Sequence, residues 1–194
     1  RAFLEVLQQG KGGVTGDEIQ TRIIGALLGS PYNLEWPTDE EIRTEFSTRT
    51  FYNRISQQRI RMILGPIDAL YQRERVKGEQ ANFDYDKLEI EHIMPQRWQA
   101  HWSVPAADPQ ALQIAEQERE RRINRIGNLT LVTGSLNPAM GHAGWAEKRA
   151  ALEENSSLCL NADLRGLDTW DEAAIDARAK ILADAANRVW PRPS

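Results

Sequence analysis

Two short stretches in the middle of the chain alternate polar and apolar residues, whereas most of the remaining sequence follows helical spacing. The first runs from Lys87 to His92 and the second from Asn128 to Val132. Alternation with a period of two is typical of a half-buried strand, and Pro95 and Gly134 follow the two stretches closely. The sequence therefore predicts a mainly α (α+β) fold, in which helices surround one short non-helical centre.

Helix starts are marked by three capping boxes, in which the side chains at the cap and three residues later satisfy free amides of the first turn. The boxes are Thr15–Glu18, Thr38–Glu41 and Thr169–Glu172. A long helix is expected over about 53–76, with a kink or break at Gly65-Pro66. Further segments are 108–123, a charged helix or an insertion, and 144–154, a helix.

Composition excludes several classes of protein. A chain of 194 residues with 41% hydrophobic and 27% charged residues is ordinary for a globular protein of one or two domains. No apolar run approaches the roughly 20 residues that a membrane span needs. The single cysteine, Cys159, excludes an internal disulfide and paired-cysteine zinc sites, which favours a reducing, cytoplasmic setting. Because the sequence begins at Arg1, we expect a piece of a longer or processed chain.

Charge is distributed unevenly. The net charge of −4 argues against general nucleic-acid binding. Residues 43–77, however, carry eight basic and three acidic residues, and a second arginine cluster lies within 119–125. Such clusters can neutralise phosphates, or they can form solvated helix faces whose arginine stems cover apolar surface.

The centre of the chain holds residues with the chemistry for phosphodiester hydrolysis. Glu91 and His92 end the first alternating stretch, Asn128 begins the second, and Asn137 and Lys148 follow. A neutral imidazole can take a proton from water, oxygen ligands suit a hard divalent cation, and a lysine can contact phosphate. The side chains of neighbouring strand residues point to opposite faces, so Glu91 and His92 share one site only if the chain turns there.

This part of the sequence resembles the HNH (His-Me finger) nuclease domain at the C-terminus of GmrSD-type restriction enzymes. The resemblance covers about residues 84–190, and residues 1–80 match only as a helical lead-in. The motifs that carry it, in order, are Glu91–Gln96, Arg125–Leu131, Leu136-Asn137, Glu147–Arg149 and the trio Trp170, Ile175 and Arg178.

The resemblance implies a ββα-metal core inside a helical domain, with a lead-in subdomain at 1–80 and the nuclease core with C-terminal helices at 81–194. It further implies a role for each matching residue. By this likeness His92 is the general base, Glu91 and Asn137 bind Mg²⁺ or Mn²⁺, Asn128 holds the backbone of His92, and Lys148 contacts phosphate or braces the site.

The expected partner is double-stranded DNA, held through Arg122, Arg125, Arg149 and His142. His142 departs from the family pattern, which has an asparagine in this stretch, so it is a second metal ligand, a phosphate contact or neither. Related proteins join such a domain to an N-terminal nucleotide-hydrolysing, ParB-like domain and act against phage or modified DNA. The alternatives are a nuclease-like module that binds DNA or protein without hydrolysis, and a purely helical adaptor.

Overall fold

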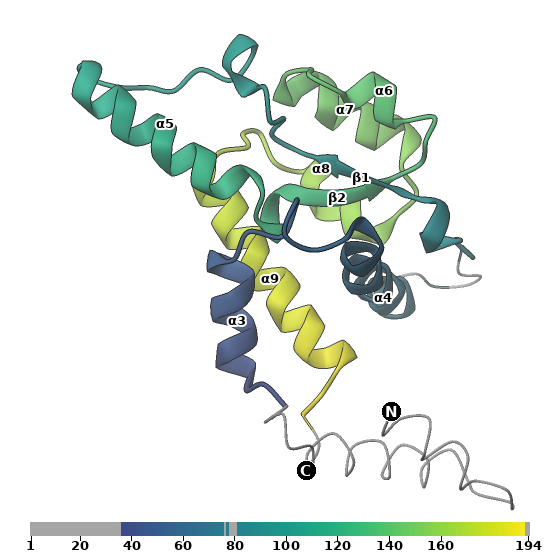
Figure 1. The fold of residues 1–194 in the computed structure, drawn as a ribbon. Coiled ribbons are helices and arrows are strands. Elements are labelled where there is room, and N and C mark those ends of the chain that lie inside the picture. Colours follow the sequence, from purple (N-terminus) through teal and green to yellow (C-terminus); the bar gives the residue numbers. More distant parts are fainter. Residues whose placement is uncertain (1–35, 76, 78–80, 193–194) are drawn as a thin grey trace, which may run out of the picture. The chain divides into compact units, whose positions relative to one another are not determined.

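The computed structural model describes residues 36–75, 77 and 81–192, and within them Asp39–Trp190 form one compact unit (Figure 1). Two strands, β1 (Glu89–His92) and β2 (Leu129–Val132), pair antiparallel, with Glu89 opposite Val132 and His92 opposite Leu129. Both predicted strands are thus confirmed. The mainly helical α+β class is confirmed as well, whereas the division near residue 80 stays a prediction, and the first capping box lies outside the described residues.

Seven α-helices and four short 3₁₀ helices make up the rest of the described elements. The α-helices are α3 (Asp39–Thr48), α4 (Gln57–Arg75), α5 (Pro109–Ile123), α6 (Asn137–Met140), α7 (Trp145–Asn155), α8 (Ala162–Arg165) and α9 (Glu172–Val189). The 3₁₀ helices are η1 (Tyr85–Lys87), η2 (Trp98–Ala100), η3 (Ile126–Asn128) and η4 (Cys159–Asn161). The charged stretch after residue 108 is therefore a helix, capped where the Asp108 side chain accepts a hydrogen bond from the Ala111 amide.

Helix α4 differs from its prediction at its start. It begins at Gln57 rather than near residue 53, because Asn53 adopts a left-handed backbone with φ of 65°. The helix continues through Pro66, so of the kink or break expected at Gly65-Pro66 the break does not occur. Gly65 has a packing role here, since a β-carbon at that position would lie 2.9 Å from the ring of Tyr85 on η1.

The start of α9 is also shifted from its prediction. The capping box placed the cap at Thr169, but the helix begins at Glu172 and its cap is Asp171, whose carboxylate accepts from the Ala174 amide at 2.8 Å. The two-residue shift leaves Trp170 outside the helix, and its ring is buried against the loop that precedes β2.

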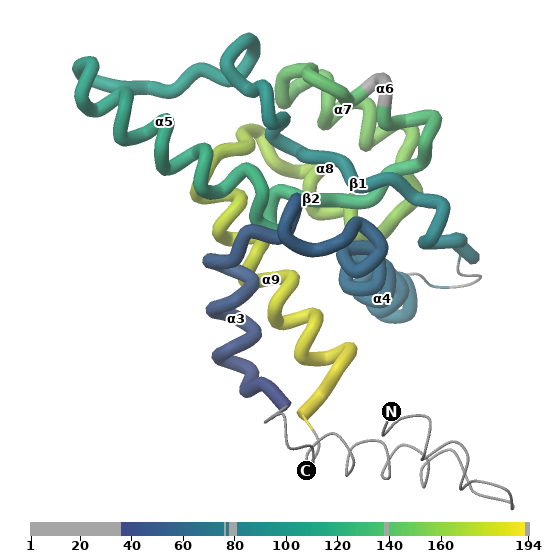
Figure 2. The backbone as a smooth tube through the Cα atoms, in the orientation of Figure 1, coloured from purple at the N-terminus to yellow at the C-terminus, as the bar shows by residue number. Residues whose placement is uncertain are grey.

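The two-stranded sheet lies between two apolar clusters. On one side α4 and α9 pack with Ile90, Leu129 and Leu131, and on the other α6 and α7 pack with Val132. Figures 1 and 2 show α4 below the sheet and α6 and α7 above it. Because alternate strand residues face opposite sides, Glu91 points toward the α6–α7 layer and His92 toward the other.

Candidate functional site

His92 lies at the end of β1 and only 8% of it is exposed. Its Nε2 is 3.0 Å from Oδ1 of Asn124, and the ring of Tyr52 meets the imidazole edge-on, with 4.4 Å between centroids. Burial lowers the pKa of His92 to about 4, and the nearby charge of Lys148 acts in the same direction, although the bond to Asn124 opposes them. The imidazole is therefore neutral at pH 7 and can accept a proton.

Lys148 joins the side chain of Glu91 to the backbone of His92. It lies on α7 with no exposed surface, and its Nζ donates to Oε1 of Glu91 and to the carbonyl oxygen of His92, each at 2.6 Å. Burial raises the pKa of Glu91 and lowers that of Lys148, while their mutual attraction opposes both shifts. Of the two predicted roles of Lys148, this geometry favours bracing, because a fully buried ammonium is not free to meet a phosphate.

Glu91 and His92 leave opposite faces of β1. Strand pairing continues through His92, which lies opposite Leu129, so the turn that would bring both side chains to one face does not occur there. In the described part of the chain the sheet has only two strands, and one edge of β1 therefore has no partner strand. Lys148 connects the two faces, since its Nζ donates both to the Glu91 side chain and to the His92 carbonyl oxygen.

Asn128 organises the loop before β2. Its Oδ1 accepts from the Met94 amide at 2.8 Å and from Nε1 of Trp170 at 3.0 Å, while its Nδ2 donates to the carbonyls of Met94 and Ile123. We expected it to hold the backbone of His92, but its carboxamide binds the backbone two residues later. The side chain is completely buried and all its hydrogen-bonding groups are used, so its part is structural.

The trio Trp170, Ile175 and Arg178, of which the last two lie on α9, holds the same loop in place. Nη1 of Arg178 donates to the carbonyls of Gly127 and Leu129, at 2.8 and 2.7 Å, and burial lowers the Arg178 pKa to about 10. A β-carbon on Gly127 would lie 2.1 Å from the carbonyl oxygen of Ile175. Gly127 is therefore required by the close approach of α9. Trp170, Ile175 and Arg178 all contact the loop that contains Gly127 and Asn128.

Side chains whose oxygen atoms could bind a metal ion lie on the α6 side of the sheet. Asn137 begins α6, and its Nδ2 donates to Oε2 of Glu89, which shares a strand face with Glu91. His142 is exposed, and its charge lies close enough to lower the pKa of Glu91. Among the described residues, no three His, Cys, Asp or Glu side chains form a ready metal cage. We did not predict from the sequence that Glu89 belongs to this site. The available signal was its position two residues before Glu91, which places both carboxylates on one face of the strand.

Three arginines predicted to contact DNA are engaged within the protein. Nε of Arg122 lies 2.9 Å and Nη1 of Arg125 lies 3.2 Å from the carboxylate of Asp176 on α9. Arg149 pairs with Asp168 at 3.1 Å. The first two hold α5 and the following loop against α9, and their side chains are less than one-fifth exposed.

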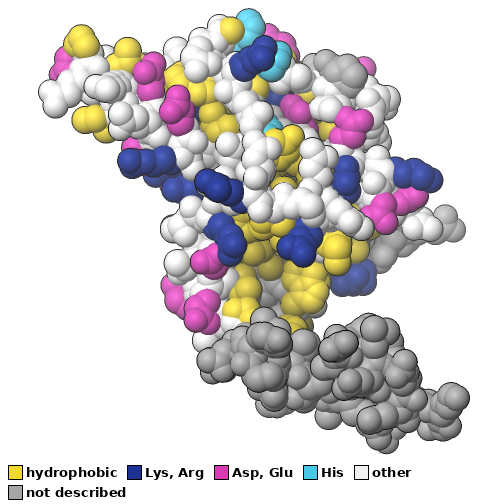
Figure 3. Space-filling view, viewed as in Figure 1, with side chains coloured by type: hydrophobic (Ala, Val, Ile, Leu, Met, Phe, Trp, Pro, Cys, Tyr) yellow, Lys and Arg dark blue, Asp and Glu magenta, His cyan; other side chains and the backbone are white. Residues whose placement is uncertain are grey.

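Two exposed arginines lie close in the sequence to residues that contact His92 or its partner Asn124. Arg54 and Arg97 are exposed, and neither forms an ion pair within the part of the chain that the structure describes. Arg54 comes two residues after Tyr52, and Arg97 follows Gln96, whose Nε2 donates to Oδ1 of Asn124 at 3.1 Å. Figure 3 shows Lys and Arg side chains crossing the middle of one face, from α5 toward the start of α4 and β1.

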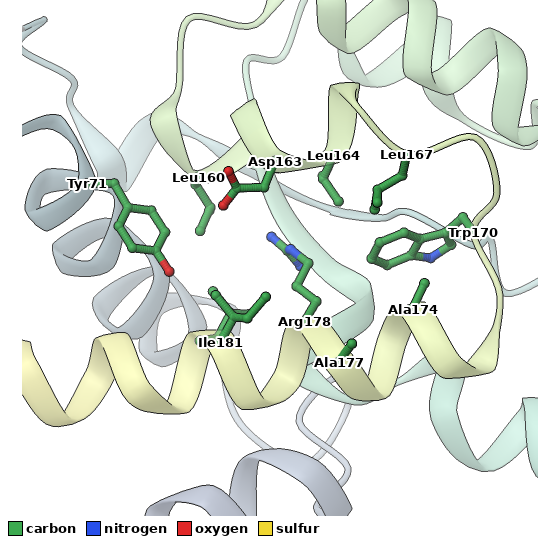
Figure 4. A pocket seen from close by; sticks show the side chains of 11 residues that line it. Tyr71, Leu160, Asp163, Leu164, Leu167, Trp170, Ala174, Ala177, Arg178 and Ile181 are labelled. Atoms are coloured by element: carbon green, nitrogen blue, oxygen red, sulfur yellow. The ribbon is translucent and has the colours of Figure 1, made fainter. Parts of the chain in front are cut away.

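A separate pocket of about 170 Å³ lies between α9 and α8 (Figure 4). Its walls are mainly apolar, and Figure 4 shows Tyr71, Trp170 and Ile181 directed toward it around the head of Arg178. Arg178 already donates to backbone carbonyls. Neither Glu91 nor His92 lines this apolar pocket, so it is separate from the candidate site at β1.

None of the described helices is both long enough and apolar enough to cross a membrane. No curated protein matches the chain. The family model of the C-terminal domain of GmrSD restriction endonucleases matches residues 36–185, which include the whole site around β1 and most of α9. The match covers well over half of the sequence, and the chain therefore belongs to the family of GmrSD restriction endonuclease C-terminal domains.

Proposed function

We propose that this domain is a metal-dependent DNA endonuclease of the HNH type in which His92 is the general base. The observation that carries the proposal is a buried, neutral imidazole at the end of a strand whose neighbouring carboxylate is fixed by Lys148. His92 takes a proton from water, and the water oxygen forms a new bond to the scissile phosphorus. The bond from phosphorus to the leaving oxygen breaks, and that oxygen is protonated by solvent.

The oxygen donors near β1 fit a hard divalent cation. Oε1 of Glu91 holds Lys148, which leaves Oε2, and Asn137 and Glu89 supply further oxygens on the same side of the sheet. Mg²⁺ is usually held by one or two carboxylates together with water and substrate phosphate, so a three-residue cage is unnecessary. We propose Glu91 and Asn137 as ligands of Mg²⁺ or Mn²⁺, and His142 as a neighbour of that site. When bound, the cation offsets charge on the scissile phosphate and the leaving oxygen.

The substrate that we propose is double-stranded DNA, foreign or modified, whose backbone meets Arg54 and Arg97. These groups are exposed and lack ion-pair partners among the described residues, in contrast to Arg122, Arg125 and Arg149. Backbone contacts of this kind position a duplex without reading its sequence. We further propose that a covalently linked, nucleotide-hydrolysing, ParB-like domain controls access, as the family resemblance implies.

A plasmid assay tests the proposal. Supercoiled plasmid is incubated with the purified chain in EDTA, Mg²⁺ or Mn²⁺, beside His92→Ala and the matched control His101→Ala, an exposed histidine outside the site. We expect metal-dependent nicking that is lost in His92→Ala, with DNA affinity little changed, and retained in His101→Ala. Equal nicking by His92→Ala would remove the base assignment.

A second candidate function is binding of DNA without hydrolysis. The observation that favours it is that both proposed metal ligands have protein partners, Lys148 for Glu91 and Glu89 for Asn137. Fluorescence anisotropy with a labelled duplex, combined with the plasmid assay, separates the two. Salt-dependent binding that is equal in EDTA and Mg²⁺, with no nicking in either metal, would favour the binding module.

A further inference from the structure

Asn124 links three segments that are far apart in the sequence. It caps the C-terminus of α5, and its carbonyl oxygen accepts from the amides of Phe51 and Tyr52, at 2.8 and 3.1 Å. Its side-chain Oδ1 faces Nε2 of His92 at 3.0 Å and Nε2 of Gln96 at 3.1 Å. The backbone of this residue thus holds the Tyr52 ring against the imidazole, while its side chain holds the imidazole itself.

The side-chain contacts determine which nitrogen of His92 carries the proton. The carboxamide of Gln96 directs a donor toward Oδ1 of Asn124, which marks this atom as the acceptor oxygen of the carboxamide. A carbonyl oxygen has no proton to give, so Nε2 of His92 must be the donor in the neutral ring. Nδ1 then keeps its lone pair and is the nitrogen that can accept a proton.

We propose that Asn124 is a positioning residue, which holds His92 as its Nε2–H tautomer so that Nδ1 is the basic atom. This inference rests on the proposed hydrolytic role of His92 and adds the identity of the basic nitrogen and the residue that selects it. Edge-on contact with Tyr52 restricts rotation of the ring, so the tautomer and the ring orientation are fixed together. A partner that fixes a tautomer in this way affects the rate without touching the reacting atoms.

Nitrogen NMR tests the tautomer independently of activity. The chain has three histidines, so ¹⁵N-detected ring spectra of the full chain at pH 8 can be assigned with His101→Ala and His142→Ala. We expect His92 to show a protonated-type shift at Nε2 and an unprotonated-type shift at Nδ1. In Asn124→Ala both shifts should move toward averaged values, whereas Asn124→Asp, which keeps the acceptor oxygen, should retain the wild-type pattern.

Plasmid nicking supplies the second readout. Asn124→Ala should lower the nicking rate by about 10- to 100-fold, and Asn124→Asp should recover part of it. The matched control is Asn155→Ala, which removes an exposed asparagine that bonds only within its own helix and should nick at the wild-type rate. Thermal unfolding of each variant checks that the fold persists, which we expect because the substitution leaves the backbone contacts of Asn124 in place.

Two results would overturn the proposal: a proton on Nδ1 of wild-type His92, or wild-type nicking by Asn124→Ala. Failure of the proposed function gives a different pattern. In that case the wild-type chain does not nick, or His92→Ala nicks equally, while the NMR spectra still report the tautomer that Asn124 selects.

Discussion

Replacing Lys148 by Met tests whether the buried pair with Glu91 braces the site. Methionine keeps the length and apolar stem of lysine but cannot donate to Oε1 of Glu91 or to the carbonyl of His92, both now 2.6 Å from Nζ. Glu91, which is 8% exposed, would then be a buried carboxylate without its cation. Breaking one half of a buried pair costs about 3–5 kcal/mol, a large share of the 5–15 kcal/mol that stabilises a typical domain.

The loss should depend on pH in a defined direction. Burial already raises the pKa of Glu91, and without Lys148 that pKa rises further. A carboxyl whose folded pKa is above its unfolded pKa contributes stability that is present at low pH and lost as pH rises. Lys148→Met should therefore be much less stable than wild type at pH 8 and closer to it at pH 5.

Urea unfolding followed by tryptophan fluorescence measures this difference at the two pH values, since the chain has six tryptophans. The double variant Glu91→Gln/Lys148→Met should lie within about 2 kcal/mol of wild type, because no unpaired charge remains. The control Lys180→Met removes an exposed lysine of α9. If Lys148→Met unfolded within about 1 kcal/mol of wild type at pH 8, the buried pair would not brace the site.

Three other predictions concern the loop, the base and the DNA surface. Gly127→Ala should abolish soluble expression or lower Tm sharply, because its methyl would lie 2.1 Å from a backbone oxygen of α9, whereas Gly166→Ala, with nothing within 4 Å, should leave Tm nearly unchanged. His92, with a folded pKa of about 4 against about 6.5 unfolded, contributes stability that is present above pH 6.5 and is lost as pH falls to 4, by about 3 kcal/mol in all. Urea titrations should show a flatter profile for His92→Gln in that window, and an unchanged profile would contradict the burial argument. Arg97→Ala should reduce the salt slope of duplex binding by about 0.9, and the ion-paired Arg149→Ala should reduce it less. Equal slopes for these two variants would count against the proposed DNA surface.

Local patterns were sufficient to predict the elements at the centre of the fold. Alternation at Lys87–His92 and Asn128–Val132 predicted both strands. It did not predict their burial, because the polar members Glu91 and Thr130 are buried as well and bond to Lys148 and Asn161. The capping box at Thr169 misled by two residues. Thr169 and Asp171 are both good caps locally, and the choice depends on Trp170 reaching Asn128, 42 residues away in sequence.

The contacts of the site were harder to predict, because they join segments that sequence spacing does not connect. Asn124 has the local pattern of a helix end, and nothing near it in the sequence indicates that its side chain meets His92, 32 residues earlier. The ion pairs of the arginine cluster could likewise be predicted only in part. The pair between Arg122 and Glu118 follows from helical spacing, but the pair with Asp176 depends on how α9 packs.

The contact of Tyr52 with His92 has a consequence for how this enzyme family can recombine. The imidazole of His92, the proposed general base, is packed against Tyr52 in a segment that precedes α4, and that segment is hydrogen-bonded through Asn124 to the end of α5. A gene fusion that began at residue 81 would transfer both strands and every residue of the sequence motif, yet it would leave behind Tyr52, whose ring packs edge-on against the imidazole. A functional unit of exchange between restriction enzymes therefore has to include the Phe51-Tyr52 segment as well as the two strands.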